Sequence, residues 1–240
     1  MKYVMTQSQA RYIQEQYGFL FLLGLNNKIS PEPETRDQLL QRGVIYDNHG
    51  YDELHPAFRA LFSCWDKMRY SVVRADLNRD TRFQCLLTNR SSTIFFDREG
   101  EQIRMDLIDF SEEKLDRFFA AVAELTSCGP VERPFTVTLS MEDYPRFINA
   151  ATEEELLSWQ KRLGLPASLL RTYLQAVLRQ EDTRLLLVED HISDVGYLMK
   201  LAPTDQGIFA LKHVTYGTGE EKVVLVYGSD SYLIDSIYQF

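Results

Sequence analysis

From residue 70 to residue 108 the chain reads YSVVRADLNRDTRFQCLLTNRSSTIFFDREGEQIRMDLI. Hydrophobic and polar residues alternate along most of this stretch, with the period of two that is typical of half-buried strands. Polar turn residues interrupt the alternation three times, at 78–80, 89–91 and 98–100. The pattern predicts four strands, at residues 71–77, 82–88, 92–97 and 102–108. Connections this short require antiparallel neighbours.

A leading strand and several helices are predicted before these four strands. Residues 3–5 form a strand candidate, and Thr6-x-x-Gln9 is a capping box that begins a helix. Its apolar stripe predicts that this helix continues to Gly24. A second capping box, Thr35-x-x-Gln38, predicts a helix over 36–42. The next expected elements are a small strand at 44–46, a turn at 47–50 and a helix starting at Pro56, which together are typical of a winged-helix-like insert. After the four strands, a closing helix is expected at 111–125.

The second half repeats this order of elements. A leading strand is predicted at 135–139 and a final helix at 230–239. Between them we expect three helices (141–149, 152–163 and 166–179) and four strands (184–189, 194–201, 207–215 and 222–226). The repetition predicts an α+β fold with a central antiparallel sheet flanked by helices, built as two pseudo-symmetric halves. We expect an N-terminal half at 1–128 that contains the winged-helix-like insert, a linker at 129–134 and a C-terminal half at 135–240, packed as one compact unit.

Composition narrows the class of function. Of the 240 residues, 45% are hydrophobic, enough for a sizeable core, and the formal net charge is −9. Binding to nucleic acid or to an anionic membrane surface is therefore not expected, because both require clustered Lys and Arg. No apolar run approaches the length of a signal peptide or of a membrane span. Three dispersed cysteines suit a reducing compartment. We expect a cytoplasmic protein.

Catalytic patterns are scarce. The four histidines form no metal-binding pair, and the chain has no nucleophile elbow, Walker loop or dinucleotide fingerprint. Cys85 or Cys128 would need a neighbouring base to act as a nucleophile, and the sequence supplies none. We therefore expect a protein that is not an enzyme and that has no cofactor and no metal.

The layout resembles the EspG family, the cytosolic chaperones of type VII (ESX) secretion, and related Gram-positive proteins encoded beside type VII substrates. The resemblance rests on three segments in the first half and one in the second: residues 23–25 (LGL), 39–45 (LLQRGVI), 55–61 (HPAFRAL) and 207–210 (GIFA). It implies two pseudo-symmetric subdomains and a chaperone that keeps one helical substrate or substrate pair soluble for export. The implied partner is a secreted helical effector or a WXG- or LXG-type protein, and the free chain is expected to be a monomer or a weak dimer.

The family contacts its substrate through a loop of the first half and a helical region of the second. The corresponding loop here is short and includes Asn89 and Arg90, so the docking mode is open. In the second half, large apolar side chains on the predicted helices are candidate anchors, and Arg162 is a candidate for the polar rim. The apolar candidates, which also suit a core, are Trp159, Leu163, Leu165, Leu169 and Tyr173. Two alternatives stay open: an immunity protein that neutralises a cognate toxin, and a small-molecule-binding or enzymatic α+β domain.

Overall fold

The protein is described as a computed structural model that covers residues 2–89, 92–109, 122, 130–150, 152–179, 183–204, 206–215 and 218–237. The chain divides into two compact units. The first comprises Met1–Val73 and Leu77–Leu115, and the second comprises Arg74–Asp76 and Asp116–Phe240. The domain limits expected at residues 128 and 135 stay a prediction. The closing helix expected at 111–125 lies outside the described residues, apart from Val122. Arg90 and Cys128 also lie outside them.

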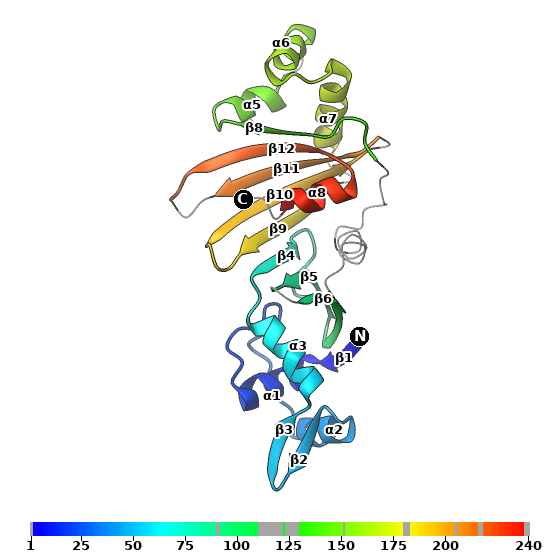
Figure 1. The fold of residues 1–240 in the computed structure, drawn as a ribbon, viewed down its shortest axis with the longest axis vertical. Coiled ribbons are helices and arrows are strands. Elements are labelled where there is room, and N and C mark those ends of the chain that lie inside the picture. Colours follow the sequence, from blue (N-terminus) through cyan, green and yellow to red (C-terminus); the bar gives the residue numbers. More distant parts are fainter. Residues whose placement is uncertain are drawn as a thin grey trace. The chain divides into compact units, whose positions relative to one another are not determined.

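Each unit contains a five-stranded antiparallel sheet (Figure 1). The first sheet has the order β1-β7-β6-β5-β4. Its strands are β1 (Lys2–Thr6), β4 (Tyr70–Arg74), β5 (Arg82–Thr88), β6 (Ser92–Glu99) and β7 (Gln102–Asp109). The second has the order β8-β12-β11-β10-β9. Its strands are β8 (Phe135–Leu139), β9 (Arg184–Asp190), β10 (Val195–Pro203), β11 (Ile208–Thr215) and β12 (Glu221–Gly228).

The two sheets have the same topology. In each, a leading strand pairs with the last strand of a four-stranded meander: β1 with β7 and β8 with β12. The α+β class, the antiparallel pairing and the pseudo-symmetric halves are therefore confirmed. The predicted strand positions are also confirmed to within a few residues, except that the strand predicted at 71–77 ends at Arg74.

The first unit places three helices and a hairpin between β1 and β4. They are α1 (Gln7–Tyr17), α2 (Thr35–Gln41), the hairpin of β2 (Ile45–Asn48) and β3 (Tyr51–Leu54), and α3 (Pro56–Asp66). Trp65 of α3 is fully buried, and its ring centroid lies 4.8 Å from that of Phe96 in β6. Aromatic packing of this kind holds α3 against the sheet.

Two local predictions in this unit are wrong, and one element was missed. The first helix ends at Gly18 (φ 70°) and not at Gly24, because a left-handed glycine terminates it. Thr35 does not cap α2. Its hydroxyl is bonded instead to Ser8 Oγ at 2.9 Å in the protein interior, and Glu34 is the N-cap residue. The strand at 44–46 and the following turn are part of a hairpin, whose second strand was not predicted.

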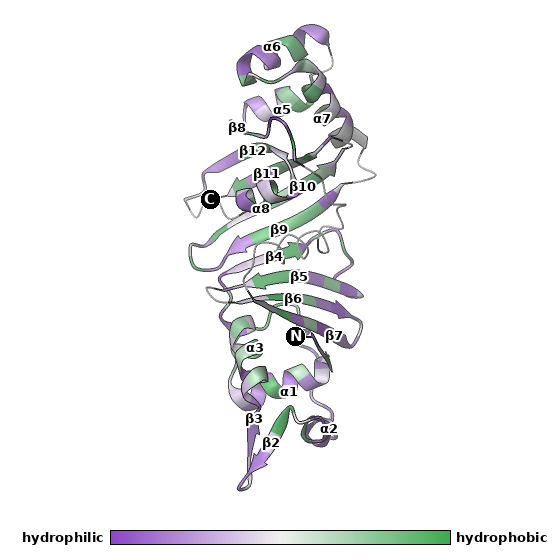
Figure 2. Ribbon diagram, turned by 45° about the vertical axis from the view of Figure 1, so that its right-hand side comes forward, coloured by the Kyte–Doolittle hydropathy of each residue, from purple (hydrophilic) through white to green (hydrophobic). Residues whose placement is uncertain are grey.

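The second unit places α5 (Asp143–Ile148), α6 (Glu153–Leu163) and α7 (Ala167–Arg179) between β8 and β9, and ends with α8 (Asp230–Ile237). Leu233 and Ile237 of α8 are buried. The end of α8 is bonded to the sheet, because Lys212 Nζ donates to the Ser236 carbonyl and Tyr197 donates to the Ile237 carbonyl. Figure 2 shows hydrophobic residues along the strands and mixed colouring on the helices, as expected for elements with one buried face.

Candidate functional site

The helices α5, α6 and α7 lie together beside β8 (Figure 1). Local sequence marks the beginnings of α5 and α6. Ser140 Oγ accepts from the Asp143 amide at 3.1 Å in the turn that leads into α5, whose N-cap residue is Glu142. Thr152 and Glu155 form the predicted capping box of α6, with bonds of 3.0 and 3.2 Å, and the left-handed Gly164 ends that helix. These short caps fix the boundaries of the layer that carries most of the predicted anchors.

The aromatic anchors predicted on these helices are core residues. Tyr173 stacks on Phe147 with ring centroids 5.5 Å apart, and the Trp159 ring meets Phe147 edge-on at 5.3 Å. Tyr173 is 1% exposed, Leu165 7% and Trp159 8%. In this structure these side chains are too buried to provide an exposed docking face, so that interpretation is corrected. Their sequence pattern did not distinguish a core stripe from an exposed one.

Leu163 and Leu169 pack at the margin of the same core and are partly buried. They therefore leave some apolar surface at the edge of the helical layer.

Arg162 occupies the exposed position expected of a polar rim. Its guanidinium donates two hydrogen bonds to the Asp143 carboxylate, one of them 2.9 Å long, and lies 4.9 Å from the centre of the Trp159 ring. These hydrogen bonds lower the pKa of Asp143. Arg162 thus joins α6 to the beginning of α5 while keeping one face in solvent.

Asn89 belongs to the first unit and forms part of the β5–β6 turn. Its amide donates to the Ser92 carbonyl at 3.0 Å, and its side-chain oxygen accepts from the Ser92 amide at 2.9 Å. The Asn89 side chain is therefore used to close the turn.

A groove of about 550 Å³ runs between α5 and α6. It is lined by Pro145, Arg146, Asn149, Glu155, Ser158, Trp159 and Arg162. A neighbouring hollow on α6 is lined by Glu154, Leu157, Ser158, Lys161 and Arg162. Arg146, Asn149 and Leu157 were not predicted. Leu157 falls outside the buried stripe and is 46% exposed, whereas the adjacent Leu156 is buried.

The groove and the hollow together form what we call the helix-pair surface: Pro145, Arg146, Asn149, Glu154, Glu155, Leu157, Ser158, Trp159, Lys161 and Arg162. It combines one exposed leucine with three cationic, two anionic and two uncharged polar side chains. Such a surface can contact an apolar side chain of a partner and pair with charged groups of either sign around it. It offers no nucleophile–base pair.

Other candidate groups have structural surroundings. Burial raises the pKa of the Cys64 thiol to about 11 and that of Cys85 well above its usual range, so neither is a thiolate at neutral pH. His213 packs against the Tyr144 ring of α5, and burial lowers its pKa. Among the residues that the structure describes, no group of His, Cys, Asp and Glu could hold a metal ion.

In the described part of the chain, no helix combines the length and the apolar composition needed to cross a bilayer.

The complete layout is similar to a solved structure, that of the Mycobacterium tuberculosis type VII secretion system chaperone EspG5 in complex with a PE25–PPE41 dimer. The match covers 99% of this chain and 94% of that one, with a TM-score of 0.60 and 12% sequence identity. This chain has the EspG5 fold. A putative adenylate cyclase from Bacillus halodurans also matches, at 13% identity over 86% of this chain and 80% of that one. Its TM-score of 0.19 is too low to indicate a shared fold. No family model and no curated protein matches the sequence.

At 12% identity, the likeness to EspG5 establishes the architecture alone. The fold implied by the resemblance in the sequence is therefore confirmed, whereas a role as a chaperone requires its own argument.

Proposed function

We propose that this protein is a cytoplasmic chaperone that binds a secreted helical protein of the type VII class and acts by binding, without catalysis. The observation that carries the proposal is the agreement in fold with EspG5 over nearly the full length of both chains. EspG5 was solved with a PE25–PPE41 dimer bound. A WXG- or LXG-type protein is the partner we propose for this chain.

The helix-pair surface is the site we assign to that partner. An amphipathic helix exposes an apolar stripe that promotes aggregation until it is covered. Leu157 provides an apolar contact for such a stripe, and it shares its hollow with Lys161, Arg162 and Glu154, so charged groups of both signs lie beside it. Leu157 is already about half covered, so completing its burial contributes about 0.7–1.4 kcal/mol, roughly half the value for a fully exposed leucine, which corresponds to a factor of roughly three to ten in affinity. Leu157→Glu adds the cost of burying a carboxylate.

The test uses the full chain, purified from a native extract together with whatever remains bound. Mass spectrometry identifies the partner, and calorimetry then measures its affinity for the wild-type protein and two variants. Leu157→Glu changes the helix-pair surface. Ile192→Glu is the matched control, because Ile192 is 67% exposed and lies in the turn between β9 and β10.

We expect a helical secreted protein whose affinity falls at least about tenfold with Leu157→Glu and is unchanged by Ile192→Glu. Recovery of only a metabolite, or equal effects of the two substitutions, would overturn the proposal. Recovery of the toxic domain of a toxin would replace it with an immunity function.

A further inference from the structure

The β2–β3 hairpin of the first unit presents an aromatic face that the proposed chaperone role does not use. Tyr46 pairs with Glu53 across the hairpin, and Asn48 pairs with Tyr51. Residues that alternate along a strand and lie opposite each other share a face of the ribbon. Tyr51 is 77% exposed and Tyr46 41%. The face formed by these four residues, here called the hairpin face, therefore presents two large rings to solvent.

Internal hydrogen bonds organise the hairpin face. Glu53 accepts from the Tyr46 hydroxyl at 2.6 Å and from Asn48 Nδ2 at 2.7 Å. At the tip, His49 (φ 55°) and Gly50 (φ 89°) both have positive φ, as a tight two-residue hairpin turn requires. The Asp47 carboxylate accepts from the Gly50 amide at 2.7 Å. Because these hydrogen bonds already hold the side chains of the hairpin, fewer side-chain conformations are lost when a partner binds.

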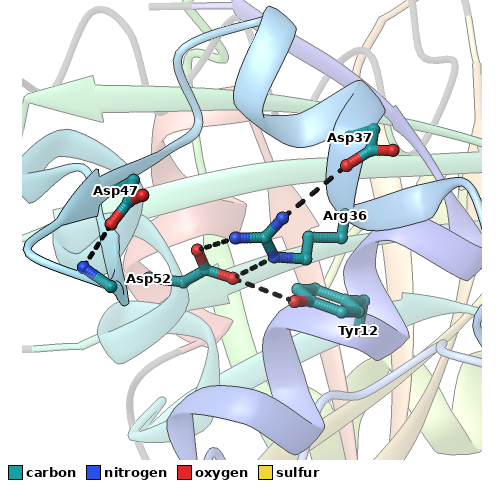
Figure 3. Close-up of polar contacts among 6 residues, drawn as sticks. Tyr12, Arg36, Asp37, Asp47 and Asp52 are labelled. Atoms are coloured by element: carbon teal, nitrogen blue, oxygen red, sulfur yellow. Dashed lines mark hydrogen bonds and ion pairs between the residues drawn. The ribbon is translucent and has the colours of Figure 1, made fainter.

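The opposite face fixes the hairpin to the helices. Ile45 and Leu54 are buried. Asp52 receives two hydrogen bonds from Arg36 of α2, at 2.7 and 2.8 Å, and one from the Tyr12 hydroxyl of α1 at 3.3 Å (Figure 3). The hairpin is thus held from behind, and the hairpin face is left to solvent.

Charge indicates what kind of partner the hairpin face accepts. The segment 30–55 contains two arginines, Arg36 and Arg42, and six acidic residues: Glu32, Glu34, Asp37, Asp47, Asp52 and Glu53. Both arginines are engaged within the unit, Arg36 with Asp52 and Arg42 with Gln9 and the Val4 carbonyl. A neighbouring cation on α3, Arg59, lies over the Tyr17 ring at 5.9 Å. The charge left over on this segment is negative.

We propose that the hairpin face is a second protein-docking surface, and that it binds an Arg- or Lys-bearing segment of a partner protein. Exposed tyrosine rings attract guanidinium and ammonium groups through cation–π contacts. Glu53 supplies a carboxylate on the same face and Asn48 supplies an amide, whereas Asp47 pairs with Asp52 and belongs to the opposite face. Tyrosine and asparagine on a fixed loop are also the composition that binding loops use, because they provide contact area and adaptable hydrogen bonds at low entropic cost.

The experiment titrates the full-length protein with fluorescein-labelled hexa-arginine and hexa-glutamate peptides and follows anisotropy. Two single variants carry the same change in net charge: Glu53→Gln on the hairpin face, and Glu220→Gln as the control in the second unit. Tyr51→Ser tests the aromatic contribution at constant charge. Urea midpoints equal to wild type establish that each variant is folded.

We expect Glu53→Gln and Tyr51→Ser each to weaken hexa-arginine binding by at least about fivefold, which corresponds to the 1 kcal/mol threshold of a significant interface residue. Glu220→Gln should change it less than about twofold, and hexa-glutamate should not bind. Equal losses in Glu53→Gln and Glu220→Gln would show that binding follows net charge alone and would overturn the proposal, as would an unaltered affinity of Tyr51→Ser. Since the helix-pair surface is not involved, the result is independent of the chaperone proposal.

Discussion

Replacing Lys212 with Met should stabilise the protein at neutral pH and destabilise it at high pH. Lys212 is 4% exposed, donates to the Ser236 carbonyl at the end of α8, and lies 4.9 Å from the centre of the Tyr197 ring. Burial lowers its pKa from the ordinary value of 10.5 to about 8. Each pKa unit corresponds to about 1.4 kcal/mol, so charging Lys212 in the folded protein costs about 3 kcal/mol.

The sign follows from proton binding. Between about pH 8 and pH 10.5 the unfolded chain holds a proton on Lys212 that the folded protein has released, so the wild-type free energy of unfolding rises with pH in this window. Met carries no proton and removes this dependence, but it also removes a hydrogen bond worth about 1 kcal/mol. Lys212→Met should therefore be about 2 kcal/mol more stable than the wild type at pH 7 and about 1 kcal/mol less stable at pH 10.5.

Urea unfolding measured at several pH values tests this expectation. The chain has two tryptophans, one in each unit, so a Trp65→Phe background leaves Trp159 to report on the second unit. The contributions of the other titrating groups to the free energy of unfolding cancel when the variant is compared with its parent. A difference that is independent of pH would refute the reasoning, because it would mean that the helix end and the Tyr197 ring compensate Lys212 fully for its burial.

Three further comparisons, made with four substitutions, test separate features of the fold. Tyr173→Phe should raise the free energy of unfolding by about 1–2 kcal/mol, because the described residues offer this buried hydroxyl no hydrogen-bond partner; a lower melting temperature would contradict this. Thr152→Ala should cost about 1 kcal/mol in urea unfolding through loss of the capping box, and an unchanged midpoint would speak against that role. Gly24→Ala should cost clearly more than Gly43→Ala. Both glycines have positive φ, but only at Gly24 would a Cβ atom come within 2.5 Å of the Phe83 ring. Equal melting temperatures of these two variants would exclude the proposed clash.

The sheets could be predicted because their signals are local. Strand alternation with turn residues between the strands predicts all four strands of each meander, and the repeated order of elements in the sequence indicates two halves. The capping-box motif predicted some helix caps correctly and one incorrectly. The motif at Thr152 is a real cap, whereas the same spacing at Thr35 serves a contact with Ser8, 27 residues away in the sequence. A motif cannot indicate a long-range partner that competes for its side chain.

The candidate site was harder to predict than the fold, because exposure depends on packing. Trp159 and Tyr173 have the residue types of interface anchors, but they are surrounded by Phe147 and Phe209. The residues that remain exposed, Leu157 and Tyr51, are unremarkable in the sequence. Which member of an apolar pair faces solvent is decided by neighbouring elements, and one sequence contains no direct signal for that choice.

The repeated topology explains where binding surfaces can arise in this fold. Each half inserts its distinctive elements at the same point, between the leading strand and the meander: a hairpin with three helices in the first, and α5, α6 and α7 in the second. The meanders are constrained by ladder pairing and by burial, so their side chains have little freedom to vary. The inserts pack on the core through one face and leave an outer face exposed. Both surfaces proposed above belong to these inserts. Substitutions of exposed insert residues should therefore change partner binding at nearly constant stability, whereas substitutions in the meanders should change stability first.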